Sequence, residues 1–261
     1  MLIRNDSNGQ WMVSQPAHAW VAGQLALAWG NSMFPSPSPR DEVVLGAILH
    51  DIGWLEWESR PTLNIESGLP HTFMELSTTA HLDIWEPASR IALPFGRYAA
   101  LLVSLHGTYL YGFHNYDRDT PDEARRAHAF VTREKALQQT LFASLRADAS
   151  ARQLTTDDAV ARNRRLLALW DRVSLAICGN ATRERMFTLE AAGARGDDLS
   201  LTVTATSVGF TLHPWPLSID ALVLRVDARR MNRTFGDQDE LNEWFSDSAL
   251  ESIEIRLAPV E

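Results

Sequence analysis

One stretch decides the fold of this chain: residues 43–53, which read VVLGAILHDIG. Its apolar run should be buried, and an imidazole and a carboxylate at its end, His50 and Asp51, are costly to bury unless both are satisfied. A divalent cation satisfies both at once, because histidine nitrogen and aspartate oxygen are ordinary ligands of zinc, iron and manganese. The alternative is a histidine that only caps the end of a helix near Gly53.

Length and composition limit the classes of protein to which the chain can belong. Its 261 residues, 45% of them apolar, are enough for one large domain with a sizeable core. A formal net charge of −9 argues against nucleic acid as the main partner, because phosphate binding needs a concentrated basic face. The single cysteine, Cys178, cannot form an intrachain disulfide, and no apolar stretch reaches the ~20 residues of a membrane span. We therefore expect a cytoplasmic protein that acts on a small molecule and not on a membrane.

Hydrophobic periodicity divides the chain into a helical part and a β-rich part. Helices are predicted for residues 16–29, 41–53, 77–92, 95–110, 122–147 and 155–179. Strands are predicted for residues 1–4, 11–14, 187–190, 199–205, 209–212, 222–226 and 253–257, with a short helix near 241–245. The expected organisation is an N-terminal β-hairpin (1–15), a helical body (16–184) and a β-rich C-terminal portion (185–261). The hairpin could join the C-terminal strands, since two strands alone are marginally stable in water.

Other metal-capable side chains lie on or beside the apolar helices. His18 falls in the first turn of the first predicted helix, and His106 follows the apolar run 99–105. His81 lies within a predicted helix, and Asp171 is a charge in a face that otherwise reads as core. Each has a structural alternative: a satisfied core histidine, or an aspartate paired with a buried arginine.

In this order the residues resemble the signature of the HD-domain superfamily, an all-helical metal-binding fold, over residues 14–180. The signature is a histidine, a His-Asp pair and a distant aspartate on separate helices. Here those residues are His18, His50, Asp51 and Asp171. His81 and His106 stand where the dinuclear members of that superfamily supply two more histidines. The whole chain also resembles an uncharacterised bacterial family with HD-like sequence. The implied fold class is mainly α, an HD-like helical bundle with an appended antiparallel β portion.

The resemblance also implies a role for each of these residues in metal binding. Asp51 would bridge two divalent ions (iron, manganese or zinc), His18, His50 and Asp171 would complete one, and His81 and His106 the other. Two such ions clamp the attacking and leaving oxygens of a displacement and activate a water. Asp51, His81 and His106 are then the expected catalytic residues. A core of four ligands around one ion is the open alternative.

Three functions remain compatible with the sequence. The first is a metal-dependent hydrolase that acts on a small phosphate ester or nucleotide through a metal-activated water. The others are a di-iron oxygenase acting on a small polar molecule, and a non-catalytic regulatory module that the metal stabilises. Trp54 stands where many HD phosphohydrolases have a lysine or another polar residue. Trp54, Trp57 and Tyr109 could line the substrate site, with core packing as the alternative for the two tryptophans.

Overall fold

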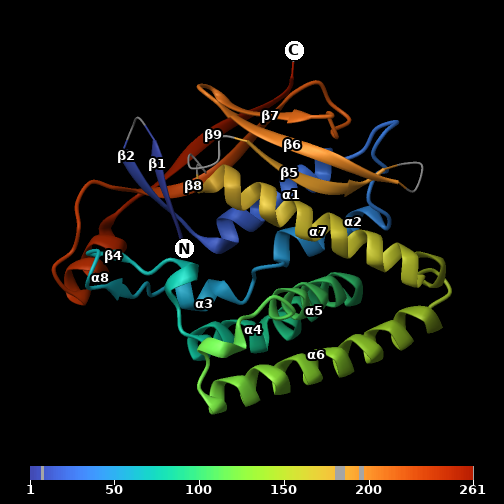
Figure 1. Ribbon diagram of the computed structural model, residues 1–261, viewed down its shortest axis with the longest axis horizontal. Helices are drawn as coiled ribbons and strands as arrows, with labels where there is room; N and C mark the ends of the chain where they lie inside the picture. The colour runs from blue at the N-terminus through green and yellow to red at the C-terminus, as the bar shows by residue number, and fades with distance from the viewer. Residues whose placement is uncertain (7–8, 180–185, 194–196, 261) are drawn as a thin grey trace.

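A computed structural model describes residues 1–6, 9–179, 186–193 and 197–260 as layers of helices under a curled sheet (Figure 1). The α-helices are α1 (Gln15–Ala28), α2 (Arg40–Leu49), α3 (Trp54–Glu58), α4 (Thr78–Ala92), α5 (Arg97–Tyr111), α6 (Pro121–Ala147), α7 (Asp157–Cys178) and α8 (Gln238–Asp247). The strands are β1 (Leu2–Asp6), β2 (Gly9–Val13), β3 (Leu63–Asn64), β4 (Leu69–Pro70), β5 (Met186–Ala192), β6 (Asp198–Thr206), β7 (Gly209–His213), β8 (Leu222–Met231) and β9 (Leu250–Pro259).

The larger sheet has seven strands in the order β1-β2-β8-β9-β7-β6-β5. Neighbouring strands pair antiparallel except β7 and β9, which run parallel, with Phe210 opposite Leu257. The helices α1 and α7 lie between this sheet and the helices α4, α5 and α6 (Figure 1). Accordingly α1 contacts β8, and α7 contacts β5. The two central helices are therefore covered on both sides, which explains why so many of their side chains are buried.

The expected fold class, a mainly α HD-like bundle with an antiparallel β appendage, is wrong. The chain is 53% helical and 22% strand, and the strands form one curled mixed sheet shaped as a half-barrel. That share of strand is the average for a globular domain and is too large for an appendage. Local periodicity finds strands but does not encode their partners, which are set by contacts far apart in the sequence. The N-terminal hairpin does join the C-terminal strands, because Met12 on β2 pairs with Arg229 on β8.

Several helix N-termini follow from capping residues that are visible in the sequence. The side chains of Ser14, Ser77, Thr120 and Thr156 accept hydrogen bonds from backbone amides in the first turns of α1, α4, α6 and α7. The segment after the His-Asp pair differs from the prediction. The second helix ends at Leu49 instead of reaching Gly53, and the short helix α3 follows at Trp54.

Gly53 is held against α4 by a close backbone approach. A Cβ atom at this position would lie 2.2 Å from the carbonyl oxygen of Ile84 and 3.0 Å from the Cβ of Ala88. The lack of a side chain lets the chain pass directly over α4, which fixes the direction in which His50 and Asp51 leave α2. Within the described residues, no helix combines the length and the apolar character that crossing a membrane requires.

Candidate metal centre

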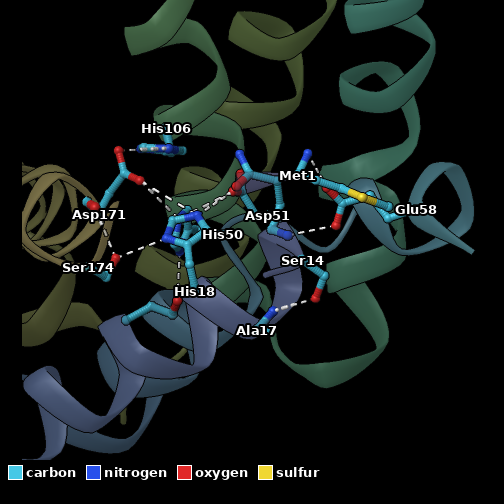
Figure 2. A network of polar contacts seen from close by, with 12 residues as sticks. Met1, Ser14, Ala17, His18, His50, Asp51, Glu58, His106, Asp171 and Ser174 are labelled. Atoms are coloured by element: carbon cyan, nitrogen blue, oxygen red, sulfur yellow. Dashed lines mark hydrogen bonds and ion pairs between the residues drawn. The ribbon is translucent and has the colours of Figure 1, made fainter. Parts of the chain in front are cut away.

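Five buried side chains from four helical segments converge in the interior of the helical layers (Figure 2). They are His18 on α1, His50 and Asp51 at the end of α2, His106 on α5 and Asp171 on α7. Asp171 has the most exposed side chain of the five, at 10%, and those of His18 and His50 are fully buried. The site therefore comes closest to solvent at Asp171.

Each residue reaches the centre from a defined point of its helix. His18 lies in the first turn of α1, where the Ser14 hydroxyl accepts a hydrogen bond from the Ala17 amide at 3.1 Å. His50 is the C-terminal cap of α2, so the backbone turns there and Asp51 follows it into the same space. His106 and Asp171 project from long, mostly buried helices.

The ligand atoms of these residues are close enough to share one ion. His18 Nε2 lies 2.7 Å from Asp51 Oδ2 and 3.9 Å from Asp171 Oδ1. His50 Nε2 lies 3.4 Å from Asp171 Oδ1 and 3.8 Å from Asp51 Oδ2, and His106 Nε2 lies 3.8 Å from Asp171 Oδ2. Two atoms each about 2.1 Å from a common ion can be at most about 4.2 Å apart. All five contacts satisfy that limit.

Hydrogen bonds at the far side of two imidazoles fix which nitrogen faces the centre. His50 Nδ1 donates to the carbonyl oxygen of Ala47 at 2.7 Å. The Ser174 hydroxyl donates to the carbonyl oxygen of Asp171 at 2.9 Å, so it accepts from His18 Nδ1 at 2.9 Å. In both rings Nε2 is therefore the nitrogen turned toward the carboxylates and the one that a metal ion would take in place of a proton, the arrangement typical of histidines that bind metals.

The fit to a cation is clearest at His50 Nε2. This atom is buried and makes no hydrogen bond within the described part of the chain, although it faces two carboxylates. A lone pair pointed at carboxylate oxygens is repulsive unless a proton or a metal ion lies between them. The carboxylates of Asp51 and Asp171 also balance the two charges of a divalent ion. Two groups of buried residues could thus hold a metal ion: His18, His50 and Asp51, and His50, His106 and Asp171.

The same charges shift the pKa values of the site residues. Burial opposes a charged His50, but Asp51 and then Asp171 outweigh it and raise the pKa of His50 to about 9. Burial also opposes ionisation of Asp171, yet the surrounding histidines, His50 foremost, hold the pKa of its carboxyl far below its usual range. Burial lowers the pKa of His106 to about 4, which keeps its imidazole in the neutral form that metals bind.

These shifts predict a steep pH dependence of metal affinity. The Nδ1 atom of His50 keeps its proton in the bond to Ala47, so Nε2 is the atom that can bind a metal ion. Below about pH 9 this Nε2 atom also carries a proton, which the metal ion must displace. We expect the Kd for a divalent ion to fall about tenfold for each pH unit between about pH 6 and pH 8. Metal titrations at several pH values measure this slope, and a pH-independent Kd would contradict the role of His50.

The structure brings together five of the six expected ligands and leaves His81 outside both groups. The Trp85 indole N–H donates to His81 Nε2 at 3.1 Å. The remaining nitrogen, Nδ1, then carries the proton and donates to the Tyr111 hydroxyl at 3.0 Å. Burial lowers the pKa of His81 to about 4, so the ring is neutral. His81 would have to give up the Trp85 contact in order to bind an ion through Nε2.

The three residues expected to line a substrate site lie in different surroundings. Trp54 is buried in the core, with its ring 5.9 Å from that of His81, and Trp57 is half-buried against the same core. Tyr109 lines a cavity between α5, α7 and β5. The positions of Trp54 and Trp57 support the core-packing alternative for both tryptophans, whereas Tyr109 lies beside a cavity.

Ser174 and Glu58 contribute to the site without having been singled out in the sequence. Ser174 lies three residues after Asp171, on the same side of α7, and that spacing could have indicated a partner for a metal-bound histidine. Glu58 is buried beside Asp51 (Figure 2), where its Oε2 accepts a hydrogen bond from the Gln15 amide at 2.6 Å and its Oε1 lies 2.6 Å from the Met1 amino nitrogen. Glu58 thereby ties α3 to the start of α1, on which His18 lies.

Comparison with known proteins gives a family without an assigned activity. A family model described as "Protein of unknown function (DUF3891)" matches residues 1–233. No curated protein and no solved structure matches the chain. The chemistry of the site therefore has to be judged from its own residues.

Proposed function

Since the chain belongs to the DUF3891 family, whose name carries no activity, we propose from the site alone that it is a metal-dependent hydrolase of a small phosphate ester or nucleotide. One observation carries the proposal. The Nε2 atoms of His18 and His50 face the carboxylates of Asp51 and Asp171 while their Nδ1 atoms are held by Ser174 and Ala47.

We further propose that one divalent ion, of iron, manganese or zinc, is the resident cofactor. His50 can give only one nitrogen to the centre, and both three-residue groups need it, so they describe one position and not two. His18, His50, Asp51 and Asp171 would hold the ion, with His106 as a fifth ligand. The resemblance to dinuclear HD proteins suggests a second ion, but with His81 bound to Trp85 a single ion is the simpler proposal.

The donor set favours a reactive centre over a purely structural one. Closed structural sites usually rely on thiolates, and the only cysteine, Cys178, is not among the site residues. When bound, a divalent ion supplies a Lewis acid that activates water at neutral pH. His18 and His50 would hold the ion through Nε2, and Asp51 and Asp171 would neutralise its charge and accept hydrogen bonds at the oxygens that do not bind it. Burial of all five groups excludes bulk water and strengthens these interactions.

A substrate panel with a matched pair of variants tests the proposal. Protein loaded in turn with manganese, zinc and iron is assayed on phosphomonoesters, phosphodiesters and nucleotides. We expect metal-dependent turnover of at least one class that Asp51→Asn abolishes and Asp119→Asn leaves unchanged. Asp119 is a suitable control because its buried carboxylate also lies 2.7 Å from a histidine, His114, but away from the centre.

One result would contradict a hydrolase. If the metal-loaded protein turns over no member of the panel, the proposal is wrong. Oxygen uptake by the reduced iron protein would then indicate the oxygenase that the sequence left open. Metal binding without either reaction would indicate a regulatory module.

A further inference from the structure

A second feature of the molecule is a cavity of about 300 Å³ between α5, α7 and β5. Its lining includes Tyr109, Arg164, Arg165, Ala168, Arg172 and Glu190. We call this the arginine cavity. None of its residues belongs to the candidate metal centre.

The register of α7 shapes the cavity. Arg164, Ala168 and Arg172 are spaced by four residues, so they follow one another along the same face of the helix. The two arginine Cα atoms are about 12 Å apart along the helix axis. Ala168 between them has almost no side chain, which leaves a hollow flanked by two long cationic side chains. Both guanidinium groups can therefore reach toward one ligand in the hollow.

The charges of the cavity are only partly compensated. Arg165 pairs with Asp198 on β6, and Glu190 on the rim accepts a hydrogen bond from the Ser200 hydroxyl at 3.3 Å. Arg164 lies with its guanidinium carbon 5.6 Å from the centre of the Tyr109 ring. Across the described residues, neither Arg164 nor Arg172 has a carboxylate within ion-pair distance. Two unpaired cations around one hollow stand out in a chain whose net charge is −9.

We propose that the arginine cavity binds a small molecule carrying oxyanion groups, either phosphate or paired carboxylates. A guanidinium group offers a planar fork of N–H donors that matches both kinds of oxyanion with two parallel hydrogen bonds. Arg164 and Arg172 are the binding residues, Ala168 provides the floor, and the Tyr109 ring with Arg164 above it forms one wall. The site does not require the metal centre, so this proposal is tested independently of the proposed hydrolase.

Calorimetric titration of metal-free protein with inorganic pyrophosphate and with succinate tests the site. We expect saturable binding of at least one probe, weakened at least tenfold by Arg164→Gln and by Arg172→Gln. Arg256→Gln, which removes an exposed arginine of β9 outside the cavity, should leave the Kd unchanged. Tighter binding of pyrophosphate identifies a phosphate ligand, and tighter binding of succinate identifies a dicarboxylate.

Two further variants distinguish binding in the cavity from binding at the metal centre or on the outer surface. Asp51→Asn should bind the probe like the wild type, because the cavity is independent of the metal centre. Ala168→Leu should abolish binding with every charge intact, since the larger side chain fills the hollow, while circular dichroism shows a folded protein. The proposal is overturned if neither probe binds, if Arg256→Gln weakens binding as much as the cavity variants, or if a folded Ala168→Leu protein binds normally.

Discussion

Removing the metal ion should lower the melting temperature of this protein by about 8–16 °C. An ion present at about a thousand times its Kd stabilises the folded state by about 4 kcal/mol. In a chain of this size each kcal/mol shifts Tm by about 2–4 °C. The physical reason is that the site joins α1, α2, α5 and α7, and without the ion the buried carboxylates of Asp51 and Asp171 lose a divalent positive charge that compensates them.

Calorimetry of metal-loaded protein and of protein dialysed against a chelator measures this shift. The Asp51→Asn variant serves as the control: with its affinity at least a hundredfold lower, the same metal concentration should raise its melting temperature by no more than about 3–6 °C. The metal-free protein should also lose stability as the pH rises. The raised pKa of His50 contributes stability that is complete below about pH 6.5 and disappears as the pH passes about 9. Equal melting temperatures with and without metal would show that no ion links these helices.

The helices and the approximate site could be predicted because both depend on local signals. Capping residues such as Ser14 and Thr156, each followed by an apolar periodic run, mark where helices begin. A histidine or aspartate inside such a run must be satisfied in the interior, which is why the sequence alone points to His18, His106 and Asp171.

The sheet and the role of His81 could not be predicted, because both depend on contacts that the local pattern does not encode. Whether β2 pairs with β8 is decided by contacts between residues more than two hundred positions apart. His81 has the same residue type and the same apolar surroundings as the ligands. Only the position of the Trp85 indole, one turn away on α4, shows that its Nε2 already has a partner. A sequence pattern gives the candidates for a site, and hydrogen bonds at the ring nitrogens decide among them.

Replacing Asp51 with asparagine should weaken metal binding at least a hundredfold. The change keeps the shape of the side chain but removes the charge that faces both His18 and His50, at 2.7 and 3.8 Å. Loss of a partner that only orients a ligand costs about 10–100-fold in metal affinity, so loss of a direct ligand should cost at least the upper end of that range.

Two further variants give reference values for the loss of metal affinity in Asp51→Asn. Ser174→Ala leaves all five ligands in place but removes the acceptor that holds His18 Nδ1, so it should weaken binding by about 10–100-fold. Asp119→Asn alters a half-buried His-Asp pair of the same length elsewhere and should leave the affinity unchanged. Elemental analysis and metal titration of the folded variants give the order directly. If Asp51→Asn keeps its metal while Ser174→Ala loses it, the ion is not held between Asp51 and the two histidines. The buried cluster would then be a charge network that a proton on His50 is enough to satisfy.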